Sequence, residues 1–453
     1  MNAMKHRAER PDNRLDLNMF HLLVTPQPNT YTYPSMNSQQ EKSLPSVNLL
    51  FLAWGLATLL SLSVPSALSA QKKIIAQAEI YLKSGKELSK AEKLLADLLA
   101  DSANQGNLKI RLLLFETVRK QYEQGNEKLF LKQKYDTTSL FISTKKMFYI
   151  AEGIDSIDAS PDKHGKIRLK YRKKNGEYLQ DIRPNLFNGG TFFSQKHDYA
   201  RAFDFYETYI RTAASPLFTL SHDEKEKALM HRAAYGTVYC GYKMQNPDKI
   251  LRYFDLAMND KDNTAFVCQY GAYAHLLRQD TTRYIAMLWK GFRHEPGFAY
   301  FFPRLVDYYQ KVNRPDSAMY VIDRALSADS TNVVYRLAKS NVLLNMGHYE
   351  ECIAICESLL SRNDTLPDVY LNIGLAYFNQ AVELDKRARP TKDVQRKIRA
   401  FYEKSRVPME TYRRMMPQEE RRWYRILYTI YLNLNMGKEF DEIERYRQAR
   451  QTL

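Results

Sequence analysis

Three contiguous segments of this chain repeat one spacing of bulky and small residues at a period of 34 residues. The first spans 299–332, the second spans 333–366, and the third begins at Pro367 and runs to Gln380. The residues that carry the pattern are Phe302, Leu305, Tyr309, Ala318, Ile322, Ala325, Gly347, Tyr349, Cys352, Ile353, Cys356, Tyr370, Ile373, Gly374 and Tyr377. A period of this length predicts stacked copies of one small unit, because each copy is too small to bury its own hydrophobic face.

Helical periodicity also dominates the chain between Gln71 and the repeats. One long stripe follows the i, i+3, i+4, i+7 pattern of an amphipathic helix, and two shorter stripes precede it. Their members are Ile110, Leu113, Leu114, Thr117, Val118, Tyr122, Ile74, Ala78, Leu82, Leu88, Ala91, Leu95 and Leu98. No stretch alternates apolar and polar residues over the length of a strand, and 17 Gly and 17 Pro are too few for a loop-rich β fold. We therefore predict an all-α protein.

Two adjacent glycines, Gly189 and Gly190, stand in a segment that otherwise has helical spacing. Each glycine costs about 1 kcal/mol relative to alanine inside a helix. When Tyr199, Ala202 and Tyr206 are aligned with the second helix of a repeat, both glycines fall in the first helix, at positions seven and eight. We predict that two helices cross so closely there that a side chain would hold them apart.

By these residues the chain resembles the tetratricopeptide repeat (TPR) superfamily, and its arrangement resembles exported repeat proteins of the bacterial envelope. The resemblance implies a right-handed superhelix of antiparallel helix pairs, a TPR solenoid, whose concave face holds a peptide or another protein. The predicted organisation is an N-terminal extension at 1–46, a signal peptide at 47–70, an N-terminal helical region at 71–184, divergent TPR-like helix pairs at 185–298, and a TPR array at 299–453 with an insertion at 381–420.

Residues 47–70 contain an apolar run that is followed by small residues and ends at Ala70. The run is shorter than the roughly 20 residues of a membrane-spanning helix, and its small-residue end is typical of a signal-peptide cleavage site. We expect export to the periplasm or cell envelope, with no integral membrane segment in the mature chain. An inner-membrane signal anchor and a buried helix are the alternatives. Met36 begins a segment of ordinary signal-peptide length, so residues 1–35 are interpreted as an upstream mis-start.

The net charge of +16 favours acidic proteins, anionic envelope polymers or nucleic acid as partners. Export makes nucleic acid the least expected of the three. Cys352 and Cys356 lie one helical turn apart and are interpreted as small core residues. Cys240 and Cys268 fall on helices predicted to be neighbours, and export permits a disulfide, but we expect the pair to stay unlinked.

The sequence contains no recognisable catalytic or cofactor-binding constellation. The nine histidines lack the HExxH spacing of a zinc site, and neither a paired-cysteine metal motif nor a GxxxxGK[ST] phosphate loop occurs. Asp155–Lys166 is acidic but lacks the carboxylate spacing of a calcium loop. His197 and His231 are interpreted as surface or packing residues. We expect a non-enzymatic protein without cofactor or metal.

The concave face of the clean repeats is assigned from repeat positions two, five, nine and twelve. The candidate partner-binding residues are Tyr300, Asp307, Gln310, Leu337, Asn341, Leu344, Leu371, Leu375 and Phe378. Leu337 and Leu371 stand where some family members place basic side chains that clamp a C-terminal carboxylate, so that mode of binding is not expected. The aromatic clusters at 298–310 and 420–434 are interpreted as core, and the basic runs at 166–174 and 386–399 as solvated faces or a rim that steers acidic partners.

The resulting hypothesis is an exported TPR scaffold that binds a protein or peptide along its concave face. Two alternatives stay open. One is a membrane-anchored or cytoplasmic regulator whose basic surface meets nucleic acid or phospholipid. The other is an envelope glycan-binding protein with aromatic platforms.

Overall fold

The computed structural model describes residues 69–162, 164–218, 224–389 and 391–451, and within these ranges the regular secondary structure is entirely helical. The prediction of an all-α fold is therefore confirmed for the described chain. Residues 1–46 and nearly all of the predicted signal peptide lie outside these ranges, and a helix covers 69–84. The contacts divide the chain into two compact units. We call the described residues up to Asn263 the N-terminal unit and those from Thr264 onward the C-terminal unit.

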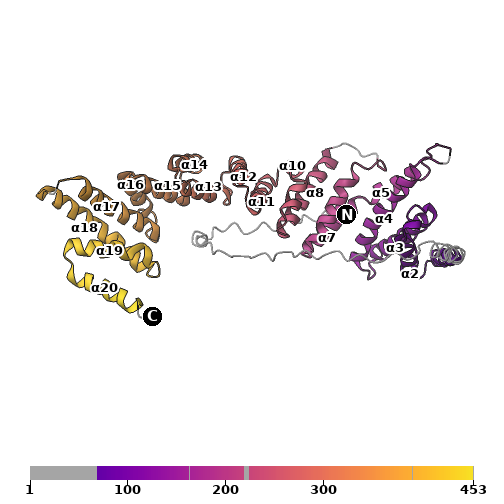
Figure 1. Cartoon of the computed structure of the whole chain (residues 1–453), viewed down its shortest axis with the longest axis horizontal. Helices are drawn as coiled ribbons and strands as arrows, with labels where there is room; N and C mark the ends of the chain where they lie inside the picture. Colours follow the sequence, from indigo (N-terminus) through magenta and orange to yellow (C-terminus); the bar gives the residue numbers. More distant parts are fainter. Residues whose placement is uncertain (1–68, 163, 219–223, 390, 452–453) are drawn as a thin grey trace, which may run out of the picture. The chain divides into compact units, whose positions relative to one another are not determined.

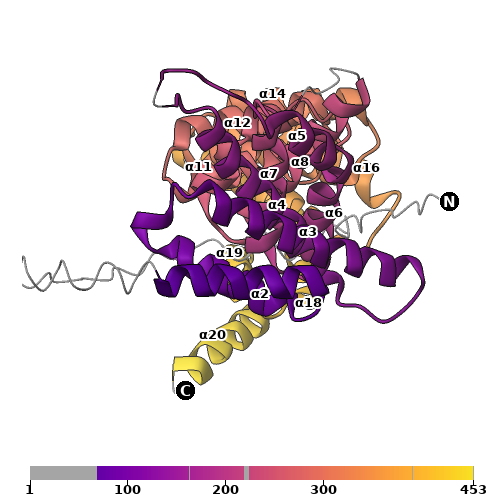
Figure 2. The same cartoon turned by 90° about the vertical axis from the view of Figure 1, so that its right-hand side faces the viewer.

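The N-terminal unit is a succession of helices in which each packs against its neighbours in the chain (Figures 1 and 2). Side chains cap several of the helices: Asp136, for example, accepts hydrogen bonds from the backbone N–H groups of Thr138 and Ser139. After the helix at 69–84, the elements are α2 (Leu88–Ala100), the short 3-10 helix η2 (Ser102–Asn104), α3 (Leu108–Phe130), α4 (Thr137–Asp158), α5 (Arg172–Ile182), α6 (Pro184–Gln195), α7 (Tyr199–Thr212), α8 (Glu224–Lys243), α9 (Pro247–Arg252) and α10 (Phe254–Ala257).

The two glycines at 189 and 190 lie where α6 crosses α7. A Cβ built on Gly189 would be 2.6 Å from the ring of Phe205, and one on Gly190 would be 2.6 Å from the ring of Tyr206. Both distances are far below an ordinary van der Waals contact. The predicted close crossing is confirmed, and its physical cause is that an aromatic ring occupies the place of each missing side chain.

A buried cation links α6 to the following two helices. The Arg183 side chain is 3% exposed and pairs with Glu226 of α8. Its guanidinium lies over the ring of Tyr209, 4.0 Å from the centroid, and donates to the Tyr209 carbonyl at 2.9 Å and to Thr212 Oγ1 at 3.3 Å. Arg183 therefore stabilises the junction of α6, α7 and α8 by several charge-assisted contacts at once.

The C-terminal unit consists of successive helix pairs. Its elements are α11 (Thr264–Leu277), α12 (Thr281–His294), α13 (Phe301–Lys311), α14 (Pro315–Ala328), α15 (Val333–Met346), α16 (Tyr349–Leu360), α17 (Pro367–Arg387), α18 (Lys392–Met415), α19 (Glu420–Leu434) and α20 (Gly437–Gln451). The first helices of two consecutive pairs, α15 and α17, begin 34 residues apart. The aromatic clusters contribute to the core as predicted, since Phe298, Phe301, Phe302, Trp423 and Tyr431 are all buried.

Capping residues delimit both ends of the first helix of the second repeat. Asn332 caps α15 by accepting hydrogen bonds from the backbone N–H groups of Val334 and Tyr335. Gly347 ends the same helix in the left-handed conformation, with φ of 80°, which glycine adopts without a steric penalty. α16 then packs back on α15 and buries Cys352 and Cys356.

The segment 381–420, predicted as an insertion, lies within a helix pair. Its first residues extend α17, and most of the remainder forms α18, which packs along α17. Within α18 the residues Tyr402, Ser405, Met409 and Tyr412 are buried and recur at spacings of three and four. The sequence of this segment is rich in charged residues because the other faces of α18 are exposed to solvent, while one stripe of side chains packs in the core.

All four cysteines are buried, and none of them forms a disulfide in this structure. Burial raises the pKa of the Cys240 thiol to about 12 and that of Cys268 to about 11. That Cys240 and Cys268 stay unlinked remains a prediction.

Candidate functional site

The candidates on α13 lie on an accessible polar face. Asp307 is half-buried and pairs with Lys311 at 2.9 Å, one helical turn away. Gln310 is exposed. Tyr300, at the start of the helix, lies under the guanidinium of Arg304, 3.7 Å from the ring centroid, and Arg304 Nη1 donates to the Tyr300 carbonyl at 2.9 Å. These contacts fix the side chains that a partner would meet.

The candidates on α15 differ from one another in accessibility. Leu337 is partly buried against the core of the second repeat. Asn341 accepts a hydrogen bond from Asn372 Nδ2 of α17 at 2.6 Å. Leu344 is only 8% exposed and belongs to the core formed with α16 and α17, so it is not available to a partner.

The candidates on α17 face other helices of this chain. Leu371 is 2% exposed and lies in a core shared with α18, α19 and α20. Leu375 and Phe378 pack against the same core, and the Phe378 ring meets the Tyr402 ring edge to face at 5.8 Å. The assignment from repeat positions is wrong for these three residues. It treats the first helix of a repeat as open on one side, whereas helices later in the chain cover this side of α17.

What remains accessible is a set of residues that we call the A-helix face: Tyr300 directly before α13, Arg304, Asp307, Gln310 and Lys311 of α13, and Leu337 and Asn341 of α15. It offers one carboxylate, two cations, amide groups and one aliphatic side chain. The charges balance locally through the Asp307–Lys311 ion pair. Such a surface suits hydrogen bonding to an extended polypeptide more than the binding of a strongly charged polymer.

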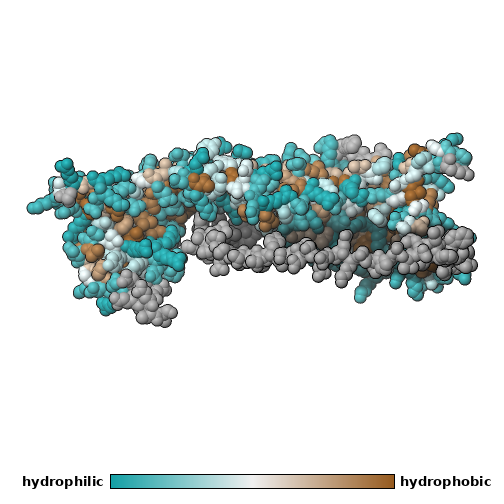
Figure 3. Space-filling view, viewed as in Figure 1, coloured by the Kyte–Doolittle hydropathy of each residue, from teal (hydrophilic) through white to brown (hydrophobic). Residues whose placement is uncertain are grey.

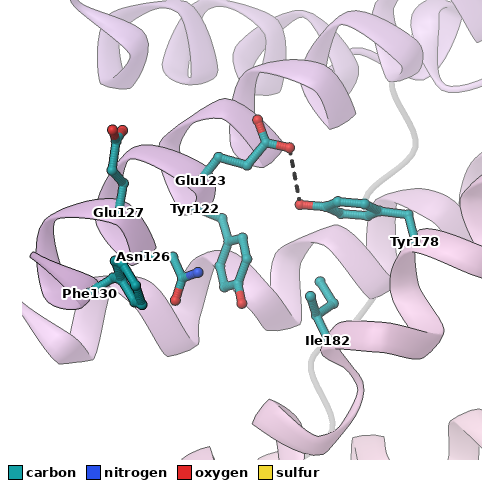
Figure 4. A pocket seen from close by; sticks show the side chains of 7 residues that line it. All are labelled: Tyr122, Glu123, Asn126, Glu127, Phe130, Tyr178 and Ile182. Atoms are coloured by element: carbon teal, nitrogen blue, oxygen red, sulfur yellow. Dashed lines mark hydrogen bonds between the residues drawn. The ribbon is translucent and has the colours of Figure 1, made fainter.

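A second candidate lies between α3 and α5 in the N-terminal unit, and Figure 4 shows it from close by. This hollow has a volume of about 520 Å³. Its lining comprises Tyr122, Glu123, Asn126, Glu127, Phe130, Tyr178 and Ile182. Phe130 at the rim is 84% exposed, which is unusual for an aromatic side chain.

Much of the polar lining of the α3–α5 hollow is already engaged within the chain. Tyr178 donates to Glu123 at 3.5 Å, and Arg119 pairs with Glu123 at 3.4 Å while lying 5.5 Å from the Tyr178 ring centroid. Tyr122 accepts a hydrogen bond from Asn185 at 2.9 Å. Burial raises the pKa of both tyrosines, so they remain neutral donors at physiological pH. The hollow can accept an apolar side chain against Phe130, but it presents little unpaired charge.

A third candidate lies between α12 and α14 in the C-terminal unit. This hollow has a volume of about 380 Å³ and is lined by Ala286, Trp289, Arg293, Tyr320 and Arg324. A spacing in the sequence indicates this hollow. An aromatic residue is followed four positions later by arginine in both helices, as Trp289 with Arg293 and as Tyr320 with Arg324.

Neither a metal-binding cluster nor a membrane-spanning helix occurs in the described ranges. There, no group of three or more His, Cys, Asp or Glu side chains is arranged to hold a metal ion. No helix in those ranges combines the length and the hydropathy that crossing a bilayer requires.

His197 is exposed, with Nδ1 2.8 Å from the Tyr199 hydroxyl. On the side drawn in Figure 3 the surface is mostly hydrophilic and is broken by separate hydrophobic spots.

No protein-family model matches the chain, and no curated protein matches it. Several solved structures are similar to it. A tetratricopeptide repeat protein from Parabacteroides merdae is 14% identical, with 55% of this chain and 98% of that one covered and a TM-score of 0.31. Human IFIT1, solved as a dimer with m7Gppp-AAAA, is 14% identical over 76% of this chain and 73% of its own, with a TM-score of 0.33. Yeast Tom70 is 11% identical over 85% and 96%, with a TM-score of 0.26. Because these TM-scores are all below 0.5, the fold assignment depends on the helix pairs of the chain itself.

Proposed function

We propose that this chain is an exported, non-catalytic TPR scaffold that binds an extended segment of a protein partner across the A-helix face. The observation that carries the proposal is the way α13 presents its polar groups. Arg304 is held against Tyr300, and Asp307 against Lys311, while the side chains stay accessible. A face whose rotamers are already restrained loses less entropy on binding than a flexible one.

The repeat architecture supports a long binding surface. Neighbouring helix pairs contact mainly each other, so stacking extends a face without a single large core. The charged groups of the A-helix face pair along one helix and do not converge on one point where a reacting atom could sit. This arrangement suits recognition of a chain segment.

The binding part of the proposal is tested by charge introduction on the A-helix face. The variant Asp307→Arg/Gln310→Arg adds positive charge to accessible positions of α13. The matched control, Ala354→Arg/Glu357→Arg, makes the same change in charge at exposed positions of α16. We expect partners that co-purify from native envelope to be lost from the first variant and kept by the second. Equal recovery from both variants would exclude this face.

A photo-crosslinking side chain at Gln310 gives a second, independent readout. An adduct with another protein at Gln310, and none when the same group is placed at Ala354, supports the proposed face. Adducts at both positions or at neither would contradict it.

The export part of the proposal rests on the sequence pattern at 47–70 and is tested separately. We expect the mature protein, purified from the envelope fraction, to begin at Ala70 or Gln71. If the protein retains 47–70 and fractionates with the inner membrane, it is anchored in the membrane and the export part of the proposal is wrong. That outcome leaves the binding test unaffected.

A further inference from the structure

The geometry points to a second docking site, in the α12–α14 hollow, that takes an acidic peptide segment bearing an aromatic side chain. This site goes beyond the proposed function because α12 and α14 are the second helices of their pairs, whereas the A-helix face belongs to α13 and α15. All of its residues lie within the C-terminal unit.

An aromatic floor forms the base of the site. The rings of Trp289 and Tyr320 have centroids 5.9 Å apart, and Tyr320 is 57% exposed. Trp289 is held in place, because its Nε1 donates to the Tyr309 hydroxyl at 2.9 Å. Ala286 contributes only a methyl group, which leaves the hollow open. Because the two ring planes are inclined at 45°, a planar side chain of the ligand would stack on one ring and meet the other at an angle.

Two guanidinium groups border the floor and carry uncompensated charge. Arg293 and Arg324 are both exposed, and neither has a carboxylate within ion-pair distance in the described part of the chain. The carboxylate next to Arg324 in sequence, Asp323, pairs instead with Lys339 at 2.9 Å. Arg293 lies 6.0 Å from the Trp289 ring centroid, at the limit of a cation–π contact, so its N–H groups remain available.

Two unpaired arginines next to an aromatic floor match a carboxylate with a ring beside it. Guanidinium groups bind carboxylates through paired N–H donors, and an aromatic residue in the ligand would add stacking. Nucleic acid is the weaker match, because single strands bind in basic grooves that follow several phosphates. A hollow of about 380 Å³ has room for only one or two side chains. The net positive charge of the chain would also speed encounter with an acidic segment.

The test uses the full chain and a fluorescein-labelled decapeptide of alternating glutamate and tyrosine, followed by fluorescence anisotropy. We expect binding that weakens at least about tenfold in Arg293→Glu/Arg324→Glu. The matched control is Arg421→Glu/Arg425→Glu, which makes the same charge change at exposed positions one turn apart on α19. The control should bind the peptide as the unmodified chain does.

Further binding experiments distinguish this site from the A-helix face and from a nucleic-acid site. The exposed change Tyr320→Ala should weaken the glutamate–tyrosine peptide more than a glutamate–alanine peptide. The A-helix variant Asp307→Arg/Gln310→Arg should bind the probe at least as well as the unmodified chain, which keeps failure here distinct from failure of the proposed function. The proposal is overturned if the peptide does not bind, or if both charge-reversal variants lose binding equally. It is also overturned if the chain prefers a labelled oligoadenylate and Arg293→Glu/Arg324→Glu abolishes that binding.

Discussion

The ring of Tyr206 lies directly against Gly190: a Cβ on the glycine would be 2.6 Å from Tyr206 Cδ1. The opposite edge of the same ring meets Gly236 of α8, where a Cβ would be 2.6 Å from Cε2. One ring therefore fills the space between α6 and α8, with a glycine on each side. Since neither edge has spare room, the ring cannot move away from one glycine without colliding with the other helix.

Gly190→Ala should destabilise the protein even though alanine is the better helix former. Alanine gains about 1 kcal/mol in helix propensity, but overpacking a filled interior costs about 1–3 kcal/mol, and the trapped Tyr206 ring puts this site at the upper end. We expect a lower urea midpoint and faster hydrogen exchange in α6–α8. Gly106→Ala is the control, because nothing lies within 4 Å of a Cβ there. Equal stability of the two variants would contradict the packing account.

Gly374→Ala should cost less than Gly190→Ala. A Cβ on Gly374 would be 2.5 Å from Met409 Sδ and 2.6 Å from its Cγ, but the nearest backbone atom is 3.5 Å away. A methionine side chain can change rotamer, whereas a tyrosine ring between two helices cannot. Thermal unfolding of both variants side by side measures the difference. A larger loss for Gly374→Ala would show that Met409 is as constrained as Tyr206.

The glycine positions show what the sequence could predict. Gly190 and Gly374 occupy the same repeat position, and both lie where two helices approach closely. The prediction worked because the requirement is local: only a residue without a side chain fits such a crossing, whatever surrounds the helix pair. The same holds for Gly347 of the repeat pattern, whose capping role depends on a few neighbouring backbone groups.

Leu371 and Leu344 show what the sequence could not predict. Their exposure depends on helices that fold over them from later in the chain, and a position within a repeat carries no information about that coverage. For Leu371 the covering elements are α18 and α19. The core-facing stripe of α18 could not be recognised in the sequence because Ser405 interrupts it and charged residues surround it.

Replacing Arg183 should be among the most destabilising changes in the N-terminal unit. Arg183→Met removes the cation that pairs with Glu226 and one of the two donors to the Tyr209 carbonyl, which keeps the Thr212 hydroxyl at 3.0 Å; removing one partner of a buried pair costs about 3–5 kcal/mol. The Glu226 side chain is 23% exposed, so we expect the lower part of that range. The control Lys227→Met breaks an exposed ion pair on α8 and should cost less than about 1 kcal/mol. Similar melting temperatures for the two variants would contradict this ranking.

Stability should fall as the pH rises above about 9, in part because of the buried thiols. The pKa of Cys240 is raised by burial from 9.0 to about 12. Below pH 9 the thiol is protonated in both states, so its contribution is fully present. Between 9 and 12 the unfolded chain loses the proton first, and the free energy of unfolding decreases with pH. Cys240→Ala should show a shallower decline than the unmodified chain in urea titrations across this range. Parallel slopes would assign the alkaline sensitivity to other groups, such as the buried tyrosines.

Asn372→Asp should uncouple the second and third repeats of the array. Asn372 is 2% exposed and its Nδ2 donates to Asn341 Oδ1 at 2.6 Å and to Ser340 Oγ at 3.0 Å, so one amide group joins α17 to α15. A carboxylate there would face the Asn341 acceptor in a buried position, at a cost of at least about 1–3 kcal/mol. Because repeat arrays are stabilised by nearest-neighbour interfaces, weakening one interface should broaden the unfolding transition as well as lower its midpoint. Hydrogen exchange should then show α17–α19 opening separately from α13–α15.

Lowering the pH to about 4 should restore much of the stability that Asn372→Asp loses, because the neutral acid can donate to Asn341. Asn372→Leu, which removes the amide without adding charge, should keep a single sharp transition. If the leucine variant broadens as much as the aspartate variant, the hydrogen bonds themselves couple the repeats, and the buried charge is not the cause.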